Sequence, residues 1–237
     1  MGAPPTSNKL IQCDDISVQY GEHVIFAHAN VSFERGAFVA VTGPNGSGKT
    51  TFLRMLLRLI PTSSGTLHTD FHEHSAGYVP QSRHIDPIYP VTAYDIIAMG
   101  LYKELGWWRR LQPQHKEKIE GLLTQFGLQE AAYQRFSALS GGMKQKVLIA
   151  RALVSGAEVF IFDEPFTGLD TETQEEVLHI IMELHRDGKT LFMTLHGADL
   201  EVVPAEQICL VKGQRVQLCS REDYLNSHTT SEVDKHV

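Results

Sequence analysis

Long apolar runs are absent from this chain of 237 residues. A membrane-spanning helix needs about 18 consecutive apolar residues, whereas candidates such as Val147–Val154 are only long enough for a core segment. Cysteine is also scarce, because Cys13, Cys209 and Cys219 are too few and too scattered for a disulfide framework or a zinc knuckle. The sequence therefore predicts a globular protein of a reducing cytosol, without a membrane span.

An excess of positive charge is missing as well. The chain carries 21 lysines and arginines against 28 acidic residues, which gives a formal net charge of −7. Sequence-independent binding of nucleic acid requires a basic face, so we expect no nucleic-acid partner. The hydrophobic content of 42% suffices for one substantial core, or for one core with an appended lobe.

The first third of the chain predicts several strands, then a glycine-rich loop and a helix. From Leu10 to Val41, β-forming residues alternate or cluster between glycines, which favours an antiparallel start. A glycine-rich loop follows, and then a helix that Pro61 should stop. Its expected apolar face recurs at helical spacing and consists of Leu53, Leu56, Leu57 and Ile60.

The remainder predicts a helical lobe and then alternating helices and strands. Composition turns helical from about Val91 to Phe136, after a short strand at "GYVP". Beyond Ser140, helix, buried strand, helix and strand alternate, the order that produces a parallel sheet covered by helices. A hairpin turning at Lys212 and Gly213 closes the pattern. We expect one domain over residues 10–218, a helical subdomain inserted at about 91–150, and flexible tails at 1–9 and 226–237.

The loop "GPNGSGKT" matches G-x-x-x-x-G-K-[ST] in full, with the required strand before it and helix after it. Glycines let successive N–H groups curl around an anion, and the helix adds its positive end. We expect Lys49 to reach the terminal phosphates of a nucleoside triphosphate and the Thr50 hydroxyl to bind Mg²⁺. The residues expected to bind the nucleotide here are Gly43, Asn45, Gly46, Ser47, Gly48, Lys49, Thr50 and Thr51.

Two acids follow the buried hydrophobic run Val159–Phe162. A buried strand of an open α/β sheet ends where such sheets bind ligands. Asp163 suits the second contact to the metal. Glu164 should point elsewhere, where it can polarise a water for attack on the γ-phosphate. A base of this kind favours ATP hydrolysis over nucleotide storage.

The segment "LSGGMKQ" at Leu139–Gln145 resembles the LSGGQ signature of ATP-binding cassette (ABC) ATPases, and the resemblance extends from about Leu10 to Leu218. It implies an α/β P-loop domain with a mixed β-sheet core, an N-terminal antiparallel β subdomain and a helical signature subdomain. Tyr20 is similar to the aromatic residue that stacks on adenine. Gln81 is similar to the glutamine that links the active site, including its metal, to the helical lobe, and His196 to the switch histidine.

The signature also predicts a dimer. Ser140, Gly141 and Gly142 precede a helix and form a second anion site, useful only if the γ-phosphate of another subunit reaches it. We expect a homodimer that encloses two ATP molecules head to tail. The segment "TGLD", which ends at Asp170, is similar to the loop that crosses between subunits in the family.

Three positions depart from the family pattern. Met143 replaces the signature glutamine, and Lys146 stands where arginine is common. Gly197 replaces the aspartate that commonly follows the switch histidine. Met143 follows the serine and glycines of the signature, so we expect its effect to be small. Gly197 leaves the fine tuning of the switch open, and we expect the chemistry to be unchanged.

The stretch around "PVTAYDIIAMG" and "GWWRR" is similar to a segment of bacterial manganese, zinc and iron importers, where it receives a permease helix. Trp107 and Trp108 fit either core packing of the lobe or anchors in that interface. The resemblance implies an ATPase at the cytoplasmic face of the inner membrane, working with an integral-membrane permease and, indirectly, an extracytoplasmic metal-binding protein. The alternatives are a soluble ABC ATPase of translation or DNA maintenance and the ATPase of an exporter.

Overall fold

The computed structural model describes residues 8–71, 76–81, 89–105, 110–196 and 199–226. These residues form two compact units. The first unit combines the chain up to residue 73 with the chain from residue 185 onward, and the second unit comprises residues 74–184. Within the described residues, no helix is both long enough and apolar enough to cross a membrane.

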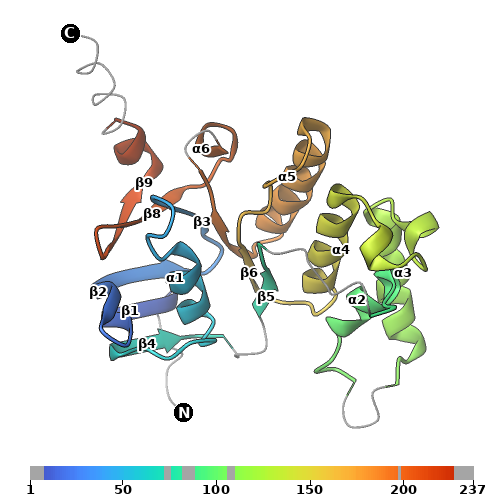
Figure 1. Cartoon of the computed structure of the whole chain (residues 1–237), viewed down its shortest axis with the longest axis horizontal. Helices are drawn as coiled ribbons and strands as arrows, with labels where there is room; N and C mark the ends of the chain where they lie inside the picture. The colour runs from blue at the N-terminus through green and yellow to red at the C-terminus, as the bar shows by residue number, and fades with distance from the viewer. Residues whose placement is uncertain (1–7, 72–75, 82–88, 106–109, 197–198, 227–237) are drawn as a thin grey trace. The chain divides into compact units, whose positions relative to one another are not determined.

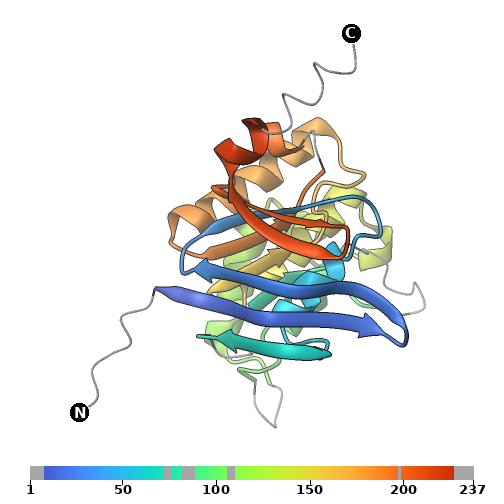
Figure 2. The same cartoon turned by 90° about the vertical axis from the view of Figure 1, so that its left-hand side faces the viewer.

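The first unit begins with the predicted antiparallel sheet. Strand β1 (Lys9–Tyr20) pairs on one side with β2 (His23–Glu34) and on the other with β4 (Ser64–Thr69), both antiparallel. Figure 2 looks onto these three strands, with the hairpin β8–β9 beside β2. The β2 strand begins at His23, because Val24 and Phe26 already pair with Gln19 and Val18 of β1.

A second layer of strands in this unit carries the phosphate loop. Strand β3 (Phe38–Thr42) lies between β7 (Thr190–Thr194) and β8 (Gln207–Lys212) and is parallel to both. All five residues of β3 and of β7 are buried, as a strand covered on both faces requires. Strand β9 (Arg215–Ser220) returns antiparallel to β8.

Two boundaries in this unit differ from the sequence-based expectation. The β8–β9 turn is formed by Gly213 and Gln214, one position later than predicted, and both adopt positive φ, as a two-residue hairpin turn demands. Helix α1 (Lys49–Leu56) ends before Ile60, because Arg58 adopts a left-handed φ of 55°. The buried face of α1 includes Phe52 and Met55 rather than Ile60.

Aromatic contacts connect the layers of the first unit. Phe33 of β2 meets Phe192 of β7 edge to face, with ring centroids 4.9 Å apart. Phe52 of α1 packs against Phe26 of β2 at 5.8 Å. The antiparallel sheet, α1 and the parallel strands therefore share one core around the strand that leads into the phosphate loop. A short helix, α6 (Asp199–Val202), follows β7.

The second unit holds the helical lobe and a parallel strand pair. Strand β5 (Ala76–Val79) pairs with the fully buried β6 (Val159–Phe162). The helices are α2 (Ala93–Met99), α3 (Pro113–Gln125), α4 (Gly141–Leu153) and α5 (Thr171–Arg186), with 3-10 turns η1 (Gln129–Ala131) and η2 (Phe136–Ala138). Figure 1 shows α2, α3 and α4 clustered together.

The lobe packs closely where α2 ends. A side chain on Gly100 would collide with the backbone carbonyl of Arg151 in α4, so this position tolerates only glycine without a shift of the helices. Thr92 caps α2, and Asp95 completes a capping box with it. Helices α2 and α3 lie within the range of about 91–150 expected for the helical subdomain. Trp107 and Trp108 lie outside the described residues.

Candidate functional site

The phosphate loop leaves the carboxyl end of β3 through backbone conformations that side chains would obstruct. Gly46 and Gly48 have φ values of 75° and 101°, both left-handed. A side chain at Gly48 would also meet the side chain of Ile25 on β2. The loop enters α1 directly at Lys49, so the first N–H groups of this helix lie next to the loop.

Two polar side chains of the loop are arranged for an anion. Lys49 is 7% exposed, and its Nζ donates to the carbonyl oxygens of Gly43 at 2.9 Å and Pro44 at 3.1 Å. The Ser47 hydroxyl is buried and has no hydrogen-bond partner among the described residues. A buried hydroxyl in that state is costly unless a ligand satisfies it. The loop therefore fits the phosphates of a nucleotide.

His196 lies at the same edge of the parallel strands. The Leu195 N–H donates to the carbonyl of Val41 at 3.1 Å, so β7 and β3 end side by side. His196 is the second residue after β7, and the phosphate loop begins directly after β3. The His196 backbone N–H donates to Asp199, which holds the start of α6 against this residue. His196 is itself exposed.

Tyr20 closes β1 opposite His23, at the turn between β1 and β2. Its side chain is 54% exposed, so the face of its ring is accessible to a flat ligand. A tyrosine packed in the sheet would be buried instead. The Tyr20 ring is therefore not part of the core of the sheet.

The second unit brings three predicted site residues together at the carboxyl ends of β5 and β6. Glu164 accepts a hydrogen bond from the Gln81 amide nitrogen at 2.6 Å and another from the Thr167 hydroxyl at 3.1 Å. Its backbone has a φ of 49°, an uncommon conformation for a glutamate. The carboxylate is fixed by its neighbours rather than left to rotate.

Asp163 is 2% exposed, and its backbone N–H continues the β5–β6 pairing by donating to Val79. The Tyr78 hydroxyl donates to its Oδ2 at 3.3 Å. The carbonyl of Tyr78 in turn accepts a hydrogen bond from Arg151 of α4 at 3.1 Å. Tyr78 therefore connects the buried carboxylate to the helical lobe. Sequence reasoning did not single it out, because one tyrosine in a short strand carries no signal of such a contact.

The signature segment also takes the predicted form. Ser140 is the N-cap of α4, and its hydroxyl accepts from the Met143 N–H at 3.2 Å. Gly141 and Gly142 form the first turn, so no side chain covers the helix start from these two positions. Asp170 caps α5 in the same unit, accepting from the Thr173 N–H at 2.9 Å. This hydrogen bond, more than any other interaction, lowers the pKa of the Asp170 carboxyl.

Comparisons with known proteins agree with this geometry. The family model of the ABC transporter matches residues 26–167. The manganese transport ATP-binding protein MntB of Bacillus subtilis is 31% identical, with 78% of this chain and 76% of that protein covered. The zinc transport ATP-binding protein TroB of Treponema pallidum is 33% identical over 81% of this chain and 74% of its own. AdcC, a zinc transport ATP-binding protein of Streptococcus pneumoniae, is 32% identical, with 81% of this chain and 85% of that protein covered.

Solved structures show the same fold. An ABC transporter in an inward-facing conformation aligns with a TM-score of 0.82 at 26% identity, with 91% of this chain and 85% of that chain covered. A dimeric ATP-binding cassette bound to ADP and phosphate aligns with a TM-score of 0.76 at 24% identity, with 90% of this chain and 99% of that chain covered. The second likeness supports the fold alone.

The fold and the phosphate loop define a P-loop ATPase. The chain belongs to the ABC transporter family, and its activity is ATP hydrolysis.

Proposed function

We propose that this protein is the ATP-hydrolysing subunit of a bacterial importer for a transition-metal cation, manganese or zinc in the first instance. The observation that carries the proposal is a phosphate loop, two acids after a buried strand and a capped signature in a chain whose relatives MntB, TroB and AdcC, matched over most of its length, are named as manganese and zinc transport proteins. Iron remains a third candidate cargo from the resemblance of the segment around residues 91–100.

Each site residue has a role in this proposal. Lys49 and Ser47 bind the phosphates of ATP, because the lysine is already directed into the loop and the serine lacks any other partner among the described residues. Glu164 accepts the proton of the attacking water, and Gln81 holds its carboxylate in place. Tyr20 stacks on adenine, and His196 contacts the γ-phosphate. The loop residues Gly43, Asn45, Gly46, Gly48, Thr50 and Thr51 complete the nucleotide contacts.

The residues also fit Mg²⁺. Asp163 supplies a buried carboxylate, Thr50 a hydroxyl and Gln81 an amide oxygen, all hard oxygen ligands of the kind that this ion prefers. The Gln81 amide nitrogen faces Glu164, which leaves its oxygen as the atom available to a cation. When bound, the ion neutralises charge on the phosphates.

A dimer completes the site. The capped but uncovered helix start at Ser140, Gly141 and Gly142 is suited to a γ-phosphate held by a second copy of the chain. The segment Thr167–Asp170, here called the Asp170 loop, crosses to that second copy. Two copies related by a two-fold axis would then enclose two ATP molecules, each between one phosphate loop and one signature.

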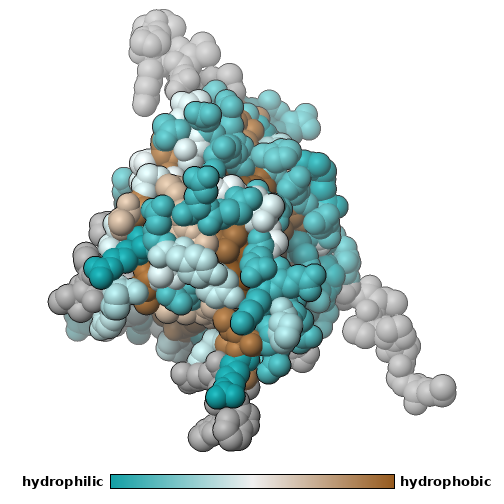
Figure 3. Space-filling view, turned by 90° about the vertical axis from the view of Figure 1, so that its right-hand side faces the viewer, coloured by the Kyte–Doolittle hydropathy of each residue, from teal (hydrophilic) through white to brown (hydrophobic). Residues whose placement is uncertain are grey.

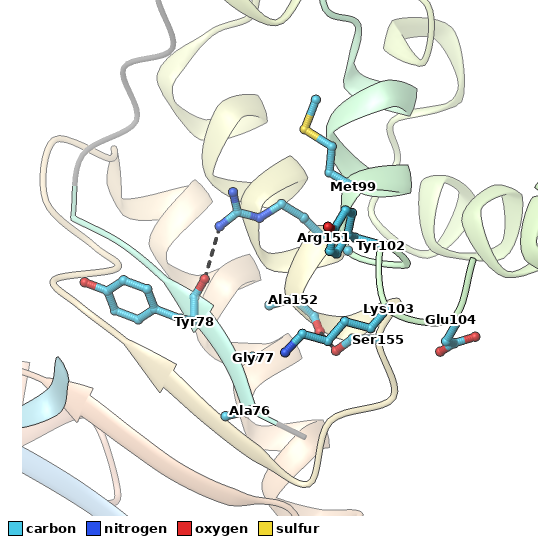
Figure 4. Close-up of a pocket in the computed structure, with 11 residues that line it drawn as sticks. Ala76, Gly77, Tyr78, Met99, Tyr102, Lys103, Glu104, Arg151, Ala152 and Ser155 are labelled. Atoms are coloured by element: carbon cyan, nitrogen blue, oxygen red, sulfur yellow. Dashed lines mark hydrogen bonds between the residues drawn. The ribbon is translucent and has the colours of Figure 1, made fainter. Parts of the chain in front are cut away.

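A groove of the second unit is suited to the permease. Its volume is about 530 Å³, and Met99, Tyr102 and Arg151 line it together with small residues of β5 and α4. Figure 4 shows Tyr78 and Arg151 joined at one end, with Lys103 and Glu104 at the other. Met99 and Tyr102 are 52% and 56% exposed, although both are large and apolar.

We propose a cytoplasmic helix of the permease as the occupant of this groove. Met99 belongs to the segment that is similar to metal importers, and exposed aromatic and methionine side chains are typical of interface cores. The face of the molecule drawn in Figure 3 is mostly hydrophilic, with apolar patches near its centre. Docking there places the chain on the cytoplasmic face of the inner membrane, as a peripheral subunit that indirectly serves an extracytoplasmic metal-binding protein.

The test is purification of the tagged protein from gently solubilised native membranes, with identification of the chains that accompany it. We expect a polytopic permease. The Tyr102→Glu variant should lose it, whereas the matched Tyr133→Glu variant, at a tyrosine that is 75% exposed elsewhere on the lobe, should retain it. Recovery of ribosomal or DNA-repair proteins instead would leave the ATPase activity standing and contradict the transport function.

A further inference from the structure

The start of α5 contacts the first half of α4, which begins with the signature glycines, at two points that the ATPase roles above do not use. The first is a steric contact. A Cβ atom on Gly142 would lie 2.8 Å from the Thr173 Cγ2 and 3.1 Å from its Oγ1, so Thr173 packs directly against the backbone of the signature turn. Only a glycine permits this approach.

The second contact is an ion pair one turn further along both helices. The Lys146 Nζ lies 2.6 Å from the Glu176 Oε2. The lysine side chain is only 18% exposed, whereas that of the glutamate is 50% exposed. Lys146 therefore extends from the mostly buried side of α4 toward a partner at the protein surface. An ion pair in this position restrains the rotation of α4 about its axis.

Thr173 also contacts Asp170. Its N–H donates to Asp170 Oδ1 at 2.9 Å, and its hydroxyl donates to Oδ2 at 3.1 Å. One residue thus touches the cap of α5 on one side and the signature glycine on the other. The signature turn and the Asp170 loop are both held by the first two turns of α5.

We infer that Thr173 and Glu176 are positioning residues, which fix the signature turn to the Asp170 loop so that both meet the second subunit in one geometry. This inference rests on the proposed ATP-enclosing dimer. Because ATP bound to one subunit should be closed off by the signature of the other, loosening this junction slows turnover without weakening the first binding step at the phosphate loop. An ordinary packing role would change stability instead.

The experiment compares full-length variants in steady-state ATP hydrolysis, in affinity for a fluorescent ATP analogue and in thermal unfolding. We expect Glu176→Gln to lower kcat by roughly three- to tenfold, the effect typical of residues in one interaction network. Analogue affinity and the unfolding midpoint should stay close to wild type, because a partly exposed ion pair contributes little to stability. The matched control is Glu175→Gln, at the neighbouring exposed glutamate, which should keep the wild-type kcat.

Charge exchange supplies the decisive comparison. Lys146→Glu and Glu176→Lys should each lower kcat, and the double variant should recover most of the loss. Lys146→Arg, which keeps the pair with little disturbance of the fold, should keep kcat within about twofold. A wild-type kcat in Glu176→Gln would overturn the inference, as would a folded double variant without recovery or a large loss in Lys146→Arg. If the double variant does not fold, the kcat values of Glu176→Gln and Lys146→Arg alone decide whether the inference holds. If the wild-type chain hydrolyses no ATP, the proposed function fails instead.

Discussion

The Gln81 side-chain amide donates a hydrogen bond to the Glu164 carboxylate, with 2.6 Å between nitrogen and oxygen. Gln81 is the second residue after β5, and Glu164 is the second residue after β6. This contact joins the glutamine of the "YVPQ" segment to the carboxylate proposed as the general base. A displacement of Gln81 would therefore alter the position of this carboxylate. In the proposed complex with a permease, this contact would connect docking on the helical lobe to hydrolysis.

Glu164→Gln should reduce ATP turnover by about a hundredfold or more, the range by which general bases accelerate reactions. The amide retains the shape of the carboxylate but cannot accept the proton of water. Binding should persist, so the variant should form dimers stabilised by ATP, which gel filtration with and without ATP would detect. Unimpaired turnover would exclude Glu164 as the base.

Tyr78→Phe should lower kcat by roughly two- to tenfold, because it removes the hydroxyl that donates to Asp163 while keeping the ring. The protein should remain folded, since the carbonyl of residue 78 still accepts from Arg151. Steady-state hydrolysis at several Mg²⁺ concentrations measures the effect. Tyr133→Phe, at an exposed tyrosine of the lobe, is the control, and equal rates in both variants would remove Tyr78 from the site.

Asp170 should titrate below the usual aspartate value of 3.8, because hydrogen bonds from Thr173 favour its charged form. A carboxyl whose pKa is lowered by folding stabilises the native state above its unfolded pKa and loses that contribution as pH falls through its folded pKa. The unfolding midpoint of Asp170→Ala should therefore lie below that of wild type at neutral pH, and the two should converge in acid. A carboxyl titration by NMR with a midpoint above 3.8 would contradict this.

Cys13 and Cys209 should resist alkylation in the native protein. Burial, with a smaller effect of the Asp14 charge, raises the pKa of Cys13 to about 12, and burial raises that of Cys209 as well. The thiolate is the reactive form, so neither residue should react at neutral pH until the chain unfolds. Cys219 is partly exposed and should react alone, although slowly, because its pKa is also raised. Mass spectrometry after iodoacetamide treatment, with and without denaturant, distinguishes these outcomes.

The sequence predicted those features that local chemistry dictates. The glycines and Lys49 of the phosphate loop, the buried run before Asp163 and the capped glycines of the signature all require particular backbone shapes, and each fixes its own neighbourhood. Helix α1 was misjudged because Leu57 and Ile60 continued a helical period that the left-handed Arg58 interrupts. Periodicity does not report one residue of reversed φ.

Contacts between distant segments were beyond reach of the sequence. Tyr78 meets Asp163 only because β5 and β6 pair in a register that brings their ends together. The sequence marked Lys146 only as a departure from arginine, and nothing in the sequence indicated Glu176 of α5 as its partner. Pair contacts of this kind depend on how helices and strands pack, which a single sequence leaves unspecified.

The most direct test of the account is the initial rate of manganese and zinc uptake by cells that produce the wild-type chain, Lys49→Ala or Glu164→Gln at equal levels. We expect uptake of at least one of these metals with the wild type and loss of that uptake in both variants, because Lys49 is proposed to bind the phosphates and Glu164 to drive their hydrolysis. Uptake of both metals that is unchanged by either variant would contradict the claim that ATP hydrolysis by this chain powers their import.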